Sequence, residues 1–282
     1  MNIYIVIPAH NEELLIAKTL DSLVTQTVLP KKIVVVNDNS TDSTEAVVNN
    51  FIRKHPYISL VNTTSSEDHM PGSKVINAFY KGYKTLDDAY DVICKFDADL
   101  IFPENYLETL ITNFERDQKT GMVGGFCYIQ KGNDWVLENL TNKDHIRGAL
   151  KAYRKSCFRD IGGLKPAMGW DTVDELIAQY HKWEIKTDES LKVKHLKPTG
   201  NTYNSKAKHK QGEAFYKMRY GFIITLIASV KLALLKKQPR LISDYIAGFF
   251  KAKKERQSFL VSKPEGKFIR KLRWRKMKQK IF

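Results

Sequence analysis

The chain has 282 residues, of which 43% are hydrophobic and 11% aromatic, so it can bury a sizeable core and is not a disordered chain. Its 46 Lys and Arg outnumber 31 Asp and Glu, and the net charge of +15 predicts an anionic partner: a lipid surface, a nucleic acid or a phosphorylated ligand. The surplus is uneven, because residues 251–282 contain thirteen Lys or Arg against two Glu and so carry +11 of it.

The three cysteines, Cys94, Cys127 and Cys157, have no CxxC spacing. This spacing argues against a disulfide framework and against a cysteine zinc site. The chain opens on an apolar run at residues 3–8, which we expect to be a strand, and this run has no signal-peptide pattern of basic, apolar and small residues. These features favour a reducing, cytoplasmic setting.

In the first hundred residues, short β-branched runs alternate with helical patterns. The runs are residues 3–7, 33–36, 58–61 and 92–96. We expect four helices among these strands. The first has Asn11 as its N-cap, and the second starts near Asp42, with Glu45 completing a capping box. The third follows Ser73, and the fourth has Pro103 in its first turn. This alternation predicts an α/β fold with a mostly parallel central sheet and helices on both faces.

After Gly121 the pattern continues with an apolar strand to about residue 129, a strand around residues 147–153 and a helix from about Thr172 to Trp183. A further strand, residues 191–196, contains His195 near its end. Beyond residue 199 the composition shifts to Lys, aromatic residues and long apolar runs. We therefore expect one domain over residues 1–200 and a basic, aromatic-rich helical extension over residues 201–282.

Within the extension, the apolar stretch at residues 220–235 is interrupted by Lys231. It is shorter than the roughly 18 to 20 apolar residues that a membrane-spanning helix needs. We expect it to pack against the protein or to lie on a surface.

Polar residues follow three predicted strands, at residues 8–12, 37–42 and 97–99. Ligands of open parallel sheets bind at the carboxyl ends of strands, although helix-capping turns also use Asp and Asn at such places. Asp97 and Asp99 are harder to explain by capping, because two carboxylates so close repel each other unless a cation or proton lies between them. They predict a hard divalent metal that also binds substrate phosphates.

Six motifs follow one another along the chain: PAHNE, VVVNDNSTDST, GSKVINAFYKG, DAD, GALKAYRKSCFRDIGGL and GWDTVDEL. Over roughly residues 1–200 the chain resembles family 2 glycosyltransferases with the GT-A fold, of the kind that builds bacterial cell-surface polysaccharides. The resemblance implies inverting transfer of a sugar from a UDP- or GDP-sugar to a glycan or glycolipid hydroxyl. The usual DDGSTD of the family reads NDNSTD here, which leaves the identity of the base open.

The resemblance also implies roles for individual residues. Those expected to bind the nucleotide sugar are Pro8, Ala9, Glu12, Asp38, Lys74 and Asp97. Asp99 and Asp97 would hold Mg²⁺ or Mn²⁺, which neutralises charge on the leaving diphosphate. His195 is a further candidate metal ligand, although a lone histidine at a strand end is more often structural.

The candidate catalytic base lies in the segment from Asp171 to Glu175. On a helix, Asp171, Asp174 and Glu175 share one face, as three ordinary surface carboxylates also would. We prefer Asp174 as the base that takes the proton of the acceptor hydroxyl, with Asp171 and Glu175 as alternatives. Trp170 beside them is placed to stack on a sugar face.

The aromatic and basic residues of the extension suit the headgroup region of an anionic membrane. We therefore expect peripheral contact with the inner face of the cell membrane, and rank a solvated basic helix and then a nucleic-acid-binding arm below it. The rival function is a catalytically silent GT-A scaffold that its tail recruits. Nucleotidyl transfer ranks lower, because no glycine-rich basic loop follows the first strand.

Overall fold

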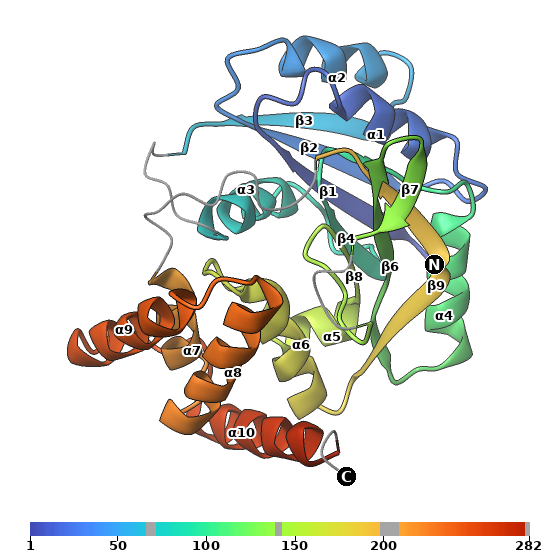
Figure 1. Ribbon diagram of the computed structural model, residues 1–282. Helices are drawn as coiled ribbons and strands as arrows, with labels where there is room; N and C mark the ends of the chain where they lie inside the picture. The colour runs from blue at the N-terminus through green and yellow to red at the C-terminus, as the bar shows by residue number, and fades with distance from the viewer. Residues whose placement is uncertain (66–71, 139–142, 198–208, 280–282) are drawn as a thin grey trace.

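The computed structural model of the protein describes residues 1–65, 72–138, 143–197 and 209–279 (Figure 1). The strands are β1 (Ile3–Ala9), β2 (Lys32–Asp38), β3 (Ile58–Thr63), β4 (Val92–Phe96), β5 (Leu100–Ile101), β6 (Thr120–Lys131), β7 (Asp134–Leu137), β8 (Leu150–Arg154) and β9 (Glu184–His195). The helices are α1 (Ile16–Val24), α2 (Thr44–Ile52), α3 (Ser73–Tyr83), α4 (Tyr106–Arg116), α5 (Lys155–Asp160), α6 (Trp170–Tyr180), α7 (Lys210–Lys217), α8 (Phe222–Leu235), α9 (Leu241–Lys254) and α10 (Lys263–Lys278).

The strands form one sheet in the order β3-β2-β1-β4-β8-β6-β9-β5, with β7 paired to β6. The ladders from β3 to β4 are parallel, whereas β8 runs antiparallel to both β4 and β6. The carboxyl ends of β1, β2 and β4 therefore meet at one edge, where the polar segments that follow them come together. The predicted α/β fold is confirmed.

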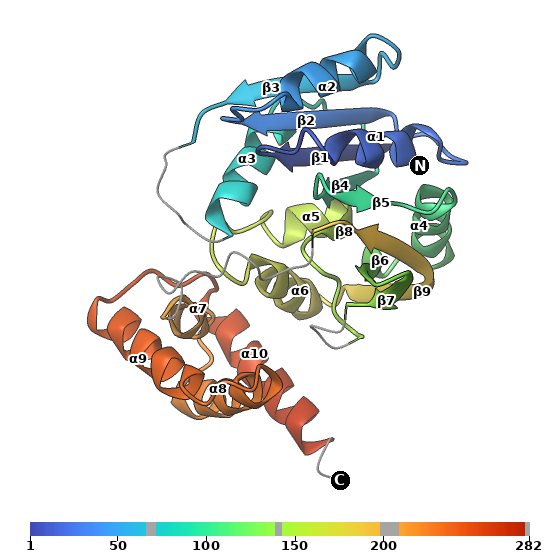
Figure 2. The same ribbon diagram turned by 45° about the horizontal axis from the view of Figure 1, so that its top comes forward.

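Helices cover both faces of the parallel strands. Figure 2 shows α1 and α2 on one face and α3 on the other. Helix α3 lies close to the sheet because Gly82 faces Val6, Val34 and Val36, and a Cβ atom at that position would come within 2.6 Å of Val36. Because both faces are covered, β1, β2 and β4 are almost continuously apolar and buried.

The expected helix starts at Asn11 and Pro103 were wrong, whereas α2 begins near Asp42 as expected. Helix α1 begins at Ile16, and Asn11 instead adopts a left-handed conformation with φ of 53° and accepts a hydrogen bond from the amide of Thr41 at 2.8 Å. Asp42 lies one residue before the N-cap of α2 and accepts from the amide of Thr44 at 3.0 Å. The loops after β1 and β2 are thus tied to each other.

Helices α7 to α10 form a separate group below the sheet (Figure 1). This group contacts α6 through α10, where the ring centroids of Tyr180 and Phe268 are 5.7 Å apart. Helix α10 begins with a capping box between Ser262 and Glu265. This agrees with a helical extension, and the predicted boundary at residue 200 lies outside the described residues. Among the described residues, no helix combines the length and apolar character that crossing a membrane requires.

Helices α7 and α9 cross at two glycines without room for a side chain. A Cβ atom at Gly248 would lie 2.0 Å from the carbonyl oxygen of His209, and one at Gly212 would lie 1.8 Å from that of Tyr245. We expect Gly248→Ala to lower the free energy of unfolding by about 1–3 kcal/mol, because backbone must move. Urea unfolding measures this, with Ala247→Ser on the exposed face of α9 as the control; equal midpoints for both variants would contradict the prediction.

Candidate active site

A cavity of about 500 Å³ opens at the carboxyl ends of β1 and β2, beside the start of α3. Four of the predicted nucleotide-binding residues line it, namely Pro8, Ala9, Asp38 and Lys74. Asp38 is 8% exposed, and its carboxylate accepts a hydrogen bond from the amide of Ser65 at 2.9 Å. The cavity thus combines a fixed carboxylate with a lysine, a pairing able to bind a sugar hydroxyl and a phosphate.

His10, which the sequence analysis did not single out, also lines this cavity. Its Nδ1 donates to the carbonyl oxygen of Asp38 at 2.7 Å and so joins the β1 loop to the end of β2. The signal in the sequence was its position between Ala9 and Asn11, directly after an apolar strand.

Glu12 lies outside the cavity lining but within electrostatic reach of the DAD triplet. Its carboxylate pairs with Lys197 at 2.6 Å. Burial raises the pKa of Glu12, the ion pair with Lys197 opposes this shift, and the charges of Asp99 and Asp97 raise the pKa further. Glu12 therefore lies close enough to Asp97 and Asp99 for their charges to affect its protonation.

Asp97 has a cationic neighbour within the protein. The ammonium group of Lys95 forms an ion pair with it and donates to the carbonyl oxygen of Gly148 at 3.1 Å. The Lys95 side chain is 2% exposed, whereas that of Asp97 is 36% exposed. Lys95 therefore neutralises Asp97 from the buried side and leaves the other side of the carboxylate open to a ligand.

Asp99 lies next to His195, as the metal-site prediction requires. His195 Nε2 is 3.4 Å from Asp99 Oδ2, and its Nδ1 is 2.9 Å from Glu138 Oε2. Burial disfavours the charged imidazole, but the hydrogen bonds with Asp99 and Glu138 outweigh it and raise the pKa of His195 to about 9. Arg147 forms an ion pair with Glu138.

Among the described residues, one further grouping could hold a metal: Cys127, Glu138 and His195 bring their ligand atoms within 4.8 Å of one another. Burial raises the pKa of Cys127 to about 12, so its thiol stays protonated, and Arg147 neutralises Glu138. The oxygen ligands that a hard cation prefers are instead those of Asp99 and Asp97, and His195 lies beside Asp99. These residues fit Mg²⁺ or Mn²⁺.

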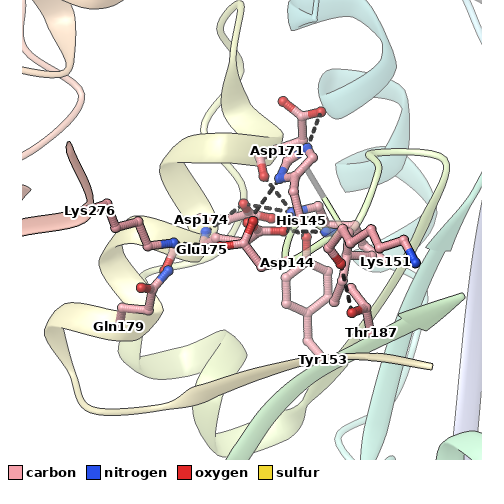
Figure 3. Close-up of polar contacts among 12 residues, drawn as sticks. Asp144, His145, Lys151, Tyr153, Asp171, Asp174, Glu175, Gln179, Thr187 and Lys276 are labelled. Atoms are coloured by element: carbon pink, nitrogen blue, oxygen red, sulfur yellow. Dashed lines mark hydrogen bonds and ion pairs between the residues drawn. The ribbon is translucent and has the colours of Figure 1, made fainter. Parts of the chain in front are cut away.

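The three candidate bases differ sharply in accessibility (Figure 3). The side chains of Asp174 and Glu175 are 1% and 7% exposed, and both are bound to the buried Lys151, whose Nζ lies 2.9 Å and 3.0 Å from them. Tyr153 donates to the second oxygen of Asp174 at 2.5 Å. Asp174 thus has both oxygens occupied inside the protein.

Asp171, in the first turn of α6, has a side chain that is 32% exposed. His145 lies beside it, with Nε2 3.7 Å from Asp171 Oδ2 and Nδ1 2.9 Å from Glu175 Oε2. Burial disfavours both charges, but their mutual attraction lowers the pKa of Asp171 to about 2 and, together with Glu175, raises that of His145 to about 9. Asp171 is therefore an ionised and accessible carboxylate.

Lys95 and Lys151 organise this end of the sheet, although the sequence analysis missed both. Each is a lone lysine within an apolar strand, and such a residue signals a buried acidic partner. Trp170 lies between them, 5.4 Å from the Nζ of Lys95 and 5.9 Å from that of Lys151. Because Trp170 is only 6% exposed, the expectation that it stacks on a sugar is not supported.

Comparisons with known proteins identify the family and the fold of the chain. The family model "Glycosyl transferase family 2" matches residues 4–163, which is more than half of the chain. A "Probable glycosyltransferase YdaM" of Bacillus subtilis is 35% identical over 200 residues, covering 62% of this chain and 44% of the relative. A poly-beta-1,6-N-acetyl-D-glucosamine synthase of Staphylococcus epidermidis is 22% identical and covers 58% and 40%. The chain thus spans less than half the length of these two relatives.

Solved structures share the fold. A mannosyltransferase of Pyrobaculum calidifontis in complex with GDP-Man and Mn²⁺ has a TM-score of 0.60 at 16% identity, covering 95% of this chain and 78% of the other. Staphylococcus aureus TarS in complex with UDP-GlcNAc has a TM-score of 0.57 at 17% identity, covering 89% and 73%. With the family match over residues 4–163, the chain belongs to glycosyltransferase family 2.

Proposed function

We propose that the protein transfers a sugar from a nucleoside-diphosphate donor to a hydroxyl of a cell-surface glycan or glycolipid precursor, with inversion at the anomeric carbon. The observation that carries this proposal is that Lys95 contacts residues of both parts of the candidate site. It contacts Asp97 on the donor side and the ring of Trp170, the residue before Asp171, on the acceptor side. Donor carboxylates and an accessible base therefore lie at one end of the sheet.

The donor nucleotide occupies the cavity at Asp38 and Lys74. Asp38, held by Ser65, accepts from the base or ribose, and Lys74 faces the phosphates. The related folds bind GDP-Man in one case and UDP-GlcNAc in another, so both nucleotides are candidates for this chain.

Asp99 and Asp97 would hold Mg²⁺ or Mn²⁺, with His195 as the third candidate ligand. When bound, the cation neutralises the charge that develops on the departing diphosphate. Glu138 fixes the orientation of His195 through the hydrogen bond to Nδ1, so that Nε2 faces Asp99.

Asp171 acts as the base in preference to Asp174. The acceptor oxygen attacks the anomeric carbon, the bond to the diphosphate breaks, and the acceptor proton moves to the Asp171 carboxylate in one displacement. His145 positions this carboxylate, because Glu175 holds the imidazole through Nδ1 and leaves Nε2 facing Asp171. Asp174 and Glu175 serve to fix Lys151 and His145 rather than to meet the acceptor.

The full chain also associates peripherally with the cytoplasmic face of an anionic membrane, where a lipid-linked acceptor would be found. The +11 charge of residues 251–282 supports this location.

A donor screen tests the enzymatic function. The full chain is incubated with UDP- and GDP-sugars and Mn²⁺, with and without lipid acceptors, and released nucleoside diphosphate is measured. We expect turnover with one donor, loss of turnover with EDTA, and at least about a tenfold higher Mn²⁺ requirement in Asp99→Ala. Asp134→Ala, an exposed carboxylate on β7, is the control. Absence of turnover with every donor would favour the silent scaffold.

A further inference from the structure

Helix α8 exposes most of its large apolar side chains and buries mainly small ones. Its buried residues are Ile224, Thr225, Ser229 and Ala233. The exposed side chains, which together with Phe250 of α9 we call the α8 face, are Phe222, Ile223, Leu226, Ile227, Val230 and Leu234. Ile223 is 59% exposed and Leu234 is 73% exposed. This is the reverse of a helix that packs its apolar side on a protein core.

The hydroxyl groups on the buried side of α8 find their hydrogen-bond partners within the helix itself. Thr225 Oγ1 donates to the carbonyl oxygen of Gly221 at 2.8 Å, and Ser229 Oγ donates to that of Thr225 at 2.7 Å. These small residues let α9 pack close, and the rings of Phe222 and Phe250 are 5.5 Å apart across the two helices. The α8 face is therefore one continuous apolar surface, larger than the scattered apolar residues usual on a monomer.

The chain around the α8 face is positively charged. Residues 222–243 contain four basic residues and no Asp or Glu: Lys231, Lys236, Lys237 and Arg240. All four are exposed. An apolar surface on a segment that carries only positive charges complements a bilayer that has anionic headgroups above its acyl chains.

We propose that the α8 face docks on an anionic phospholipid bilayer, with α8 lying in the plane of the interface. The 14 residues of α8 make it about 21 Å long, less than the hydrocarbon core of about 30 Å. The proposal deepens the peripheral membrane contact suggested above by naming the surface that makes it, and it does not depend on catalysis.

The docking surface is joined to the catalytic half through packed helices. Helix α8 packs on α9, α9 crosses α7 at Gly212 and Gly248, and α10 packs on α6, which carries Asp171. Figure 2 shows α8 on the side of this helical group that faces away from the sheet. Docking there fixes the height of the active site above the lipid headgroups.

The basic residues of α10 are partly engaged within the protein. Arg270 donates to the carbonyl oxygen of Arg219, Arg273 donates to Tyr220 Oη, and Lys276 pairs with Asp144. Part of the +11 charge of residues 251–282 therefore holds α10 in place. The α8 face, rather than the tail alone, supplies the apolar contact with lipid.

Flotation with vesicles of equimolar phosphatidylcholine and phosphatidylglycerol tests the proposal on the full chain. We expect the wild type to bind and Ile223→Glu to lower the partition coefficient about tenfold or more, because a charge replaces an apolar side chain that enters the bilayer. Leu29→Glu is the matched control, since Leu29 is 51% exposed but lies in the sheet half. Wild type that stays unbound at low salt, or equal binding of the two variants, would overturn the proposal.

Charge variants test whether the partner of the α8 face is an anionic lipid surface rather than a second copy of the chain or a nucleic acid. We expect Lys231→Gln, Lys237→Gln and Arg240→Gln together to weaken binding to anionic vesicles about tenfold or more, with little effect from Lys18→Gln, Lys54→Gln and Lys81→Gln together. If the protein does not bind vesicles but forms a dimer that Ile223→Glu dissociates, the α8 face binds a second copy of the chain. If it does not bind vesicles but is retained by duplex DNA, the partner is a nucleic acid. Either result overturns the proposal. Vesicle binding without turnover would instead leave it standing and contradict the enzymatic function.

Discussion

We expect Asp171→Asn to lower kcat by about 10²- to 10⁴-fold with little change in KM or in thermal stability. Its carboxylate is the accessible one of the three candidates on α6, with a side chain that is 32% exposed. The pKa of about 2 keeps it ionised at neutral pH. The amide of Asn keeps the shape of the side chain but cannot take the proton from the acceptor hydroxyl.

Asp174→Asn is the matched comparison, because it makes the same chemical change one helical turn away. It removes a charge that the buried Lys151 contacts at 2.9 Å, so we expect lower thermal stability and near-normal kcat per folded molecule. Steady-state kinetics and thermal unfolding of both variants decide between them. Loss of turnover confined to Asp174→Asn, with unchanged unfolding, would contradict our assignment and restore the first choice made from the sequence.

His145→Asn separates positioning from proton transfer. If His145 only orients Asp171, the variant keeps measurable turnover, and its pH–rate profile shifts because the neighbouring positive charge is lost. The pKa of Asp171 should rise toward the ordinary value for Asp, so the acid limb of kcat moves to higher pH. An unchanged profile would show that His145 has no contact with the base during turnover.

The parallel half of the sheet and the ligand-binding edge could be predicted from the sequence because both depend on local patterns. Runs of β-branched residues predict buried strands, and polar residues directly after them fall at one edge once the strands are parallel. Asp38, Asp97 and Asp99 were placed at this edge by that reasoning, and His195 was added as a candidate from the resemblance. The start of the first helix was less well predicted, because Asn11 bonds to the neighbouring loop rather than to its own helix.

The accessible base could not be chosen from the sequence. Asp171, Asp174 and Glu175 are spaced to share one helical face, and helical periodicity cannot say which part of that face another strand covers. Strand β8 determines which part is covered. Its Lys151 binds Asp174 and Glu175 inside the protein, whereas the side chain of Asp171 remains accessible. In α8, likewise, the composition predicts an apolar helix but not that its small residues face the protein.

Lys151→Met should destabilise the fold strongly. Lys151 is fully buried between Asp174 and Glu175, and removing one partner of a buried ion pair costs about 3–5 kcal/mol because the remaining charge is uncompensated. We expect a loss of this size in the free energy of unfolding at pH 8, measured with urea. Lys186→Met on β9, whose pair with Asp117 is about one-third exposed, should lose less than about 1 kcal/mol.

The pH dependence of this loss has a definite sign. Burial raises the pKa of Asp174 to about 7 in the wild type, and without the charge of Lys151 it lies higher still. Below about pH 7, Asp174 is protonated in the folded wild type and in the folded variant. Above about pH 7, the folded wild type has lost this proton, whereas the folded variant still binds it although its unfolded chain does not. The stability gap between wild type and Lys151→Met should therefore widen above about pH 7, by up to about 1.4 kcal/mol per pH unit. A gap that narrows with rising pH would contradict the buried ion pair, and adding Asp174→Asn to Lys151→Met should remove most of the widening.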